Sequence, residues 1–277
     1  LQSYYGREHC PNGFAVYKYY VGGVLFVAKL DRVGEKGTSN QGYSLEIVAY
    51  RHSADIDVLV DRKYIQKGVR YTNFKGGRIA NMYHKSVLGV GYLGVGAYVR
   101  YADGVETAAY ISWKGMLERC YNEKFLRERP SYMGCLVCDE WHNFQVYANW
   151  HEKNYYTVDN EPMDLDKDIL VKGNKIYSPT TCVFVPRRIN SLVVTNKLQR
   201  GDLPIGVVKT KRNRYVARMG YLTERKSLGT FDTPEEAFLA YKTAKEAYIK
   251  QVADEYKDKI PKKLYDALYA YTIEITD

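Results

Sequence analysis

Hydrophobic residues follow two different spacings along the chain. Up to about residue 104, apolar and aromatic residues come in short runs separated by Gly, Asn and Asp, as in residues 14–30, 44–50 and 55–60. Such runs are typical of strands joined by tight turns. The first run contains Gly22-Gly23, so we expect a two-stranded hairpin there, and a second hairpin formed by the other two runs. The N-terminal part is therefore predicted to be β-rich.

From about residue 105 the apolar residues recur at helical spacing. One stripe has the positions i, i+3, i+4, i+7 and i+8, which is the pattern of an amphipathic helix. A second stripe repeats this pattern further along the chain. We expect two helices whose apolar faces lie in the core. The first stripe is Trp113, Met116, Leu117, Cys120 and Tyr121, and the second is Trp141, Phe144, Tyr147 and Trp150.

The end of the chain carries the clearest local signals. Thr233, Pro234 and Glu236 supply an N-cap, a proline in the first helical turn and the reciprocal acid of a capping box. We expect a helix from there to about Lys257 and a shorter helix opened by Pro261. Three short apolar segments precede them, in residues 204–210, 214–222 and 226–231. They predict three strands that pack against the long helix.

These elements predict an α+β protein of three domains. The expected boundaries are a β-rich domain in residues 1–104, a middle domain in residues 105–200, and a three-stranded sheet with a helical C-terminus in residues 201–277. The chain has 277 residues, of which 45% are hydrophobic and 26% charged, so it can bury a sizeable core and is not largely disordered.

Membrane and secretion signals are missing from the sequence. No apolar run approaches the roughly 18 residues of a membrane span, and the first residues lack the pattern of a signal peptide. We expect a soluble, intracellular protein that does not bind a membrane. The five cysteines argue against a secreted disulfide scaffold. Cys135 and Cys138 have zinc-knuckle spacing, and Cys120 and Cys182 are candidates to complete a tetrahedral set. Buried, reduced thiols are the interpretation that we favour over structural zinc.

Charge is distributed unevenly along the chain. The net charge is +9, but residues 171–230 contain thirteen Lys and Arg against two acids, whereas residues 139–168 contain eight acids against two Lys. A basic block beside an acidic cluster fits a nuclease, in which the first binds phosphates and the second holds a cation. An unevenly charged solvated surface is the alternative. The 28 tyrosines are residues suited to interfaces and to base stacking, although most are expected in the core.

The C-terminal module resembles the AP2-type DNA-binding domain. The matching segments are IGV at 205–207, YVA at 215–217 and LGTFDTPEEAFLAYKTA at 228–244. The resemblance implies a three-stranded sheet that lies in the major groove of double-stranded DNA. Arg225 matches a DNA-contacting arginine of that family, and Ser227 stands where many members have a contacting tryptophan. The cations on or beside these strands, and two that precede them, are our candidate DNA-binding residues: Lys209, Lys211, Arg212, Arg214, Arg218, Arg225, Lys226, Arg187 and Arg188.

The middle of the chain resembles the HNH-like (ββα-metal-like) proteins encoded by bacteriophages. Matching segments are WKGMLERCYN at 113–122, YMGCLVCDEWHNFQVYANW at 132–150, LDKDI at 165–169 and YSPTTCVFVPRRIN at 177–190. Two N-terminal pieces, NFKGG and SVLGVGYLGVGAY, resemble a small β module that accompanies such proteins. The resemblance implies a viral protein that acts in the cytoplasm of a bacterial host.

The HNH motif implies catalytic roles that this chain fills only in part. Asp166 stands at the position of the metal-binding aspartate, Lys167 at that of the general base and Thr181 at that of the second ligand. A lysine would have to lose its proton to act as a base, and threonine is a poor ligand for Mg²⁺. Two of the three chemical roles are therefore missing.

Substitutes for the missing groups lie nearby in the sequence. Asp164 and Asp168 flank Asp166 at i−2 and i+2, so on a strand the three carboxylates would project to one face and could hold one Mg²⁺. His142 or His151 could then act as the base. An acidic strand paired with local Lys and Arg is the alternative interpretation. Our candidate catalytic residues are Asp166, Lys167 and Asp168.

Two functions fit these features. The first is a phage-type DNA-binding protein of HNH/AP2 architecture. Metal-dependent DNA nicking stays open for such a protein, but we favour the absence of cleavage because key catalytic positions are replaced. The second is a catalytically inactive phage protein with a counter-defence role, which binds and inhibits a bacterial anti-phage nuclease complex through protein–protein contacts and self-associates. We favour the first function, DNA binding, over the second.

Overall fold

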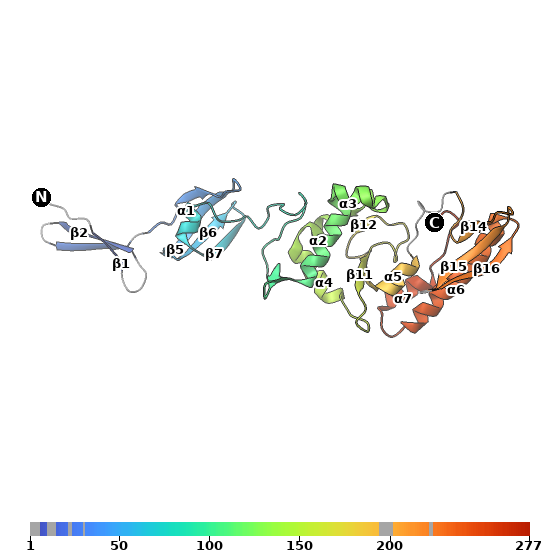
Figure 1. The fold of residues 1–277 in the computed structure, drawn as a ribbon. Coiled ribbons are helices and arrows are strands. Elements are labelled where there is room, and N and C mark those ends of the chain that lie inside the picture. The colour runs from blue at the N-terminus through green and yellow to red at the C-terminus, as the bar shows by residue number, and fades with distance from the viewer. Residues whose placement is uncertain (1–5, 10–14, 22–23, 30, 194–201, 222–223) are drawn as a thin grey trace. The chain divides into compact units, whose positions relative to one another are not determined.

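The structure is a computed structural model of the chain. It describes residues 6–9, 15–21, 24–29, 31–193, 202–221 and 224–277, with side chains for 31–193, 202–220 and 226–277. The described part is mixed α+β, with seven α-helices and several small, mainly antiparallel sheets (Figure 1), which confirms the predicted class. The chain divides into two compact units, Leu1–His84 with Tyr92–Val95, and Lys85–Gly91 with Gly96–Asp277. The division into three domains stays a prediction.

The first unit is built from two antiparallel sheets. Both predicted hairpins are confirmed, as β2–β3 and β5–β6, and the Gly22-Gly23 turn lies outside the described residues. The larger sheet encloses a core of Leu45, Ile47, Ile56, Val58, Val60, Val69, Phe74 and Ile79. The elements are β1 (Gly6–His9), β2 (Ala15–Val21), β3 (Val24–Lys29), β4 (Lys36–Thr38), β5 (Ser44–His52), β6 (Asp55–Val60), β7 (Tyr64–Val69) and α1 (Tyr71–Lys75).

The second unit begins with a helical layer. The first predicted helix is confirmed as α2, which Thr107 caps by accepting the N–H of Tyr110. The second stripe is only partly helical, because Trp141 lies in a 3₁₀ turn and the α-helix starts at Phe144 after the cap Asn143. The elements are β8 (Tyr101–Ala102), β9 (Val105–Glu106), α2 (Ala108–Tyr121), α3 (Glu123–Glu128), β10 (Leu136–Val137) and α4 (Phe144–Asn154), with 3₁₀ turns at Pro130–Tyr132 and Asp139–His142.

A strand pair followed by a helix comes next along the chain. Strand β11 (Met163–Asp166) pairs antiparallel with β13 (Val183–Pro186), and α5 (Arg187–Val193) follows directly. All four residues of β13 are buried, so this hairpin is a core element. In the segment of chain that connects these two strands, β12 (Ile176–Tyr177) pairs in parallel with β10.

The three predicted C-terminal strands are confirmed as β14 (Val207–Lys209), β15 (Tyr215–Tyr221) and β16 (Glu224–Phe231), in that order in the sheet. The capping box at Thr233 and Glu236 is also confirmed, and it starts α6 (Pro234–Glu255), which α7 (Lys262–Tyr269) follows. Gly206 precedes β14 with a φ of +78°, and a Cβ there would overlap the ring of Tyr241 on α6. Glycine therefore allows the strand to approach the helix closely.

One hydrophobic core joins the hairpin–helix segment to the C-terminal sheet. Val185 on β13 and Ile189 on α5 belong to the same buried cluster as Met219 on β15 and Val252 on α6. The two segments therefore stabilise each other, and the hairpin is held in place by helices α6 and α7, which begin only at Pro234 and Lys262. Figure 1 shows α5 beside α6 and α7.

Candidate functional site

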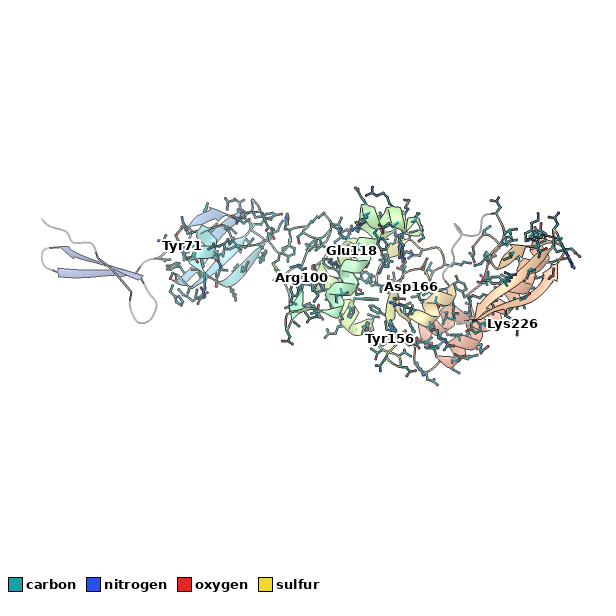
Figure 2. All side chains as sticks on the ribbon, viewed as in Figure 1. Tyr71, Arg100, Glu118, Tyr156, Asp166 and Lys226 are labelled. Carbon is teal, nitrogen blue, oxygen red and sulfur yellow. The ribbon has the colours of Figure 1, made fainter. Side chains whose placement is uncertain are left out.

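The acidic strand β11 ends at Asp166, whose carboxyl organises the turn that follows. Its Oδ1 accepts the backbone N–H of Asp168 at 2.9 Å and that of Ile169 at 2.7 Å. Burial, assisted by the nearby charge of Asp168, raises the pKa of Asp166 to about 6. Removing a carboxylate from water disfavours its charged form, and the two N–H donors offset that effect only in part. Asp166, labelled in Figure 2, therefore titrates at a higher pH than an exposed aspartate.

Asp168 lies beyond the strand, so the expected alternation covers only Asp164 and Asp166. Within the described residues, no three His, Cys, Asp or Glu side chains gather as a group that could hold a metal ion. Asp168 is instead paired with a cation, because its Oδ2 lies 3.2 Å from Nζ of Lys167.

Lys167 is held as a buried cation. Its side chain is 8% exposed, and its Nζ lies 5.9 Å from the ring centre of Tyr132 and 5.8 Å from that of Tyr177. Burial opposes the charge, but Asp168, Cys135 and Asp166 together outweigh it, so the pKa of Lys167 is raised above its ordinary value. A lysine that binds its proton more tightly than usual does not act as a base at neutral pH.

Asn190 on α5 lies beside the acidic strand and was not among the predicted site residues. Its Nδ2 donates to Oδ2 of Asp164 at 3.3 Å, and Arg187 donates to the same carboxylate at 3.1 Å. The buried Oδ1 of Asn190 has no hydrogen-bond partner. Asn190 is the last residue of YSPTTCVFVPRRIN, one of the segments that carry the HNH-like resemblance, and that was the signal available in the sequence.

Thr181, the position predicted for the second ligand, belongs to a turn. Its Oγ1 donates to the carbonyl of Ile176 at 2.8 Å and also lies 2.8 Å from the hydroxyl of Ser178. By contrast, Asp164, Asp166 and Asn190 supply the oxygen donors that Mg²⁺ prefers, and the unpartnered Oδ1 fits that use.

A pocket of 530 Å³ opens beside β11 and contains two further groups of interest. Asp164, Asn190, His151 and Arg119 all line it. Burial lowers the pKa of His151, so its imidazole is neutral at pH 7 and suited to accept a proton. The other suggested base, His142, lies elsewhere, within 3.4 Å of the hydroxyl of Tyr121.

Arg119 on α2 is the second residue that the sequence prediction missed. Its Nε donates to the hydroxyl of Tyr177 at 3.0 Å, and its guanidinium lies 5.4 Å from that ring's centre. No carboxylate of the described residues forms an ion pair with it. A guanidinium that lines a pocket without an acidic partner suits a phosphate ligand. The signal in the sequence was the Arg of WKGMLERCYN, which could equally have been a solvated helix residue.

The four candidate zinc ligands are thiols in a largely buried region. Cys120, Cys135 and Cys182 are buried, and Cys138 is half-buried. Burial raises the pKa of Cys120 and of Cys182 to about 12, so both are protonated at neutral pH in the absence of a metal. A structural zinc at these cysteines stays the less favoured alternative to reduced thiols.

The sheet β14–β16 has one face on α6 and one open face. Ala217 and Met219 are buried toward the helix, while Arg218 between them is exposed. Arg218 is paired across the sheet with Ser227, and Gly220 is paired with Arg225, so positions 218 and 225 share the open face. The side chain of Arg225 lies outside the described residues. Lys226 is opposite Met219, so its register places it on the other side of the sheet, where it is exposed (Figure 2).

The remaining candidate DNA-binding cations differ in how they are held. Lys209, Lys211 and Arg212 are exposed on β14 and the following turn. Three arginines are already bound to acids: Arg214 to Asp232 at 2.8 Å, Arg187 to Asp164 at 3.1 Å and Arg188 to Glu255 at 2.6 Å. Arg188 is 27% exposed and links α5 to α6, which is a structural role.

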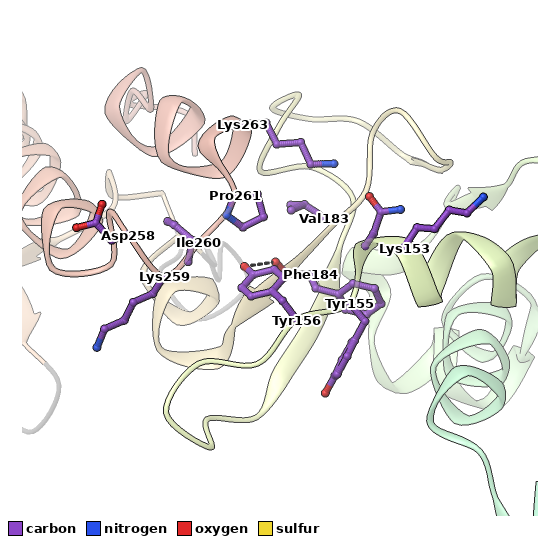
Figure 3. A pocket seen from close by; sticks show the side chains of 11 residues that line it. Lys153, Tyr155, Tyr156, Val183, Phe184, Asp258, Lys259, Ile260, Pro261 and Lys263 are labelled. Carbon is purple, nitrogen blue, oxygen red and sulfur yellow. Dashed lines mark hydrogen bonds between the residues drawn. The ribbon is translucent and has the colours of Figure 1, made fainter.

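A second pocket, of 420 Å³, lies between the end of α4, strand β13 and the loop from α6 to α7 (Figure 3). Tyr155 and Phe184 line both this pocket and the one that contains Arg119.

No protein-family model, curated protein or solved structure matches the chain. Among the described residues, no helix is both long enough and apolar enough to span a bilayer.

Proposed function

We propose that the chain is a phage-type DNA-binding protein of HNH/AP2 architecture that acts in the cytoplasm of a bacterial host. The observation that carries the proposal is the open face of the β14–β16 sheet and its first turn. Arg218, Lys211 and Arg212 are exposed there, and none of them forms an ion pair with a described residue. Cations without internal partners are available to phosphates, and their contacts supply most of the affinity for duplex DNA.

The order of elements around Asp166 supports the HNH part of the proposal. An antiparallel strand pair is followed at once by a helix, and an acid on the first strand lies beside an asparagine on that helix. Arg119 adds a phosphate-binding group to the same pocket. A duplex bound by the sheet would thus have a second contact at the hairpin.

We propose binding rather than cleavage. Lys167 is a protonated cation paired with Asp168, and Thr181 is bound within its turn, so neither fills the role that the motif gives its position. If the chain did cleave DNA, His151 would be the candidate base and Asn190 the candidate metal ligand. Supercoiled plasmid with Mg²⁺ or Mn²⁺ is expected to stay uncut. Nicking that disappears in Asp166→Ala would overturn this part of the proposal and leave DNA binding intact.

DNA binding is tested by fluorescence anisotropy with a labelled duplex at increasing salt. The affinity of the wild type should fall steeply with salt, and Arg218→Ala should reduce the slope of log K against log salt by about one. Arg214→Ala is the matched control, because Arg214 directly precedes β15 but is bound to Asp232. Equal affinities for Arg218→Ala and the wild type would refute the role of the open face.

A second function rests on exposed apolar residues in and beside the β8–β9 hairpin. Val99, Tyr101, Val105 and Ile111 are between 50% and 68% exposed, which is unusual for four apolar residues close together in the chain. Such a surface suits protein contacts, either with a host defence nuclease complex or with another copy of the chain. Sedimentation velocity would detect self-association, and Val105→Glu should abolish it. A monomer that binds duplex DNA at physiological salt would refute this alternative.

A further inference from the structure

The pocket shown in Figure 3 has an aromatic wall whose geometry is fixed by its neighbours. The ring of Tyr155 is stacked on His151, with centres 4.9 Å apart and planes 9° from parallel, and it meets Phe184 edge-on at 5.0 Å. The hydroxyl of Tyr156 donates to the backbone carbonyl of Phe184 at 2.7 Å. Although Tyr155 is held in this way, it remains 41% exposed. It therefore offers an ordered ring surface to a planar ligand.

Two lysines at this pocket have no acidic partner among the described residues. Lys153 is exposed at the end of α4, and Nζ of Lys263 is 3.5 Å from the carbonyl of Cys182 above the pocket. Lys259 is already paired with Asp159 at 2.6 Å. Figure 3 shows Lys259 and Asp258 at the end of the pocket away from Lys153 and Lys263. The part of the pocket near Lys153 and Lys263 is therefore positively charged.

Apolar residues complete the lining of the pocket. They are Val183, Ile260 and Pro261, and the volume of 420 Å³ is within the range of small-molecule sites. A ligand that matches this pocket has a flat aromatic part that stacks on Tyr155 and an anionic group that binds the two lysines. Bases stack on aromatic side chains regardless of sequence, and lysines bind the adjoining phosphate.

We propose that this pocket binds a nucleoside monophosphate unit, with the base against Tyr155 and the phosphate near Lys153 and Lys263. The unit has two sources, a free nucleotide or an unpaired nucleotide of a DNA strand. The pocket is separate from the open face of the β14–β16 sheet and does not depend on the proposed binding of duplex DNA.

The test is isothermal titration calorimetry of the full chain with thymidine 5′-monophosphate, with inorganic phosphate and with a short oligothymidylate. The mononucleotide is expected to bind, and phosphate alone is expected to bind at least about tenfold more weakly, because it lacks the stacked base. Tyr155→Leu should weaken the mononucleotide about tenfold and Tyr155→Phe should retain its affinity. Tryptophan fluorescence of each variant confirms that the second unit is folded.

The chain offers a matched control for the lysine. Lys262 neighbours Lys263 but is 85% exposed, paired with Asp266 and outside the pocket. Lys263→Ala should weaken the mononucleotide and Lys262→Ala should not. If Tyr155→Leu also weakens the oligothymidylate, the unit comes from a DNA strand; if it weakens only the mononucleotide, the source is a free nucleotide. Absence of mononucleotide binding, or equal effects of the two lysine variants, overturns the proposal. Arg218→Ala should leave this binding unchanged, so failure here and failure of duplex binding are distinguishable.

Discussion

The substitution Asp166→Asn tests whether the candidate site is maintained at a cost in stability. The carboxyl of Asp166 is buried at the end of β11, and its pKa is raised from 3.8 to about 6. Folding therefore favours the protonated form. Asparagine keeps a carbonyl oxygen for the N–H groups of Asp168 and Ile169, but it carries no charge.

The raised pKa gives both the sign and the size of the effect. Below the ordinary value of 3.8 the carboxyl of Asp166 is protonated in the folded and in the unfolded chain. As the pH rises through about 6, the folded chain must ionise a buried group, so stability falls. The difference between the two pKa values corresponds to about 3 kcal/mol. Asp166→Asn avoids this loss, so it should be more stable than the wild type by up to about 3 kcal/mol near neutral pH, with little gain near pH 4.

Urea denaturation followed by tryptophan fluorescence measures this difference. All three tryptophans, Trp113, Trp141 and Trp150, lie in the second unit, so the signal reports on the unit that contains Asp166. Asp168→Asn removes the neighbouring charge and should weaken the pH dependence of the wild type. A gain for Asp166→Asn that stays constant or shrinks between about pH 4 and pH 7 would refute the reasoning. A stabilising replacement of this kind is typical of side chains retained for function.

Three further predictions concern the fold. Gly206→Ala places a Cβ into the ring of Tyr241 at a positive φ, so it should lower the unfolding free energy of the second unit in urea by at least about 2 kcal/mol. A Cβ at Gly220 meets open space, so Gly220→Ala should change the unfolding free energy little. Similar effects of the two substitutions would contradict the close approach of sheet and helix. Thr233→Ala removes the capping box and should cost about 1 kcal/mol of unfolding free energy, and an unchanged urea midpoint would argue against the cap. The thiol of Cys120, whose pKa burial raises to about 12, should react with Ellman's reagent at pH 8 far more slowly in the folded chain than in urea; equal rates would show that it is accessible.

Elements with strong local signals were predictable from the sequence. Thr233, Pro234 and Glu236 satisfy backbone groups within one helical turn, so the start of α6 depends on neighbours in the chain. The strand positions of β14–β16 likewise follow from alternation and turns. The expected helix at Trp141 was partly wrong, because Asn143 caps α4 and leaves Trp141 in a 3₁₀ turn, with its carbonyl accepting the indole N–H of Trp113 at 2.6 Å. That bond joins residues far apart in the sequence, which no local pattern reveals.

The candidate site shows the same division between local and tertiary information. The sequence alone determined the class, the two N-terminal hairpins, the helix α2, the order of strands and helices after residue 204, and the acidic residues that flank Asp166 in the chain. Only the tertiary structure decided that β11 ends there, that Lys167 is buried against Asp168, and that Asn190 lies beside Asp164. Each of these three features depends on burial and on contacts between distant segments. Such contacts decide whether a charged side chain has an ion-pair partner and which acceptor a side-chain N–H can reach. Spacing along the chain carries no such information, because the energy of a charged group depends on what surrounds it in space.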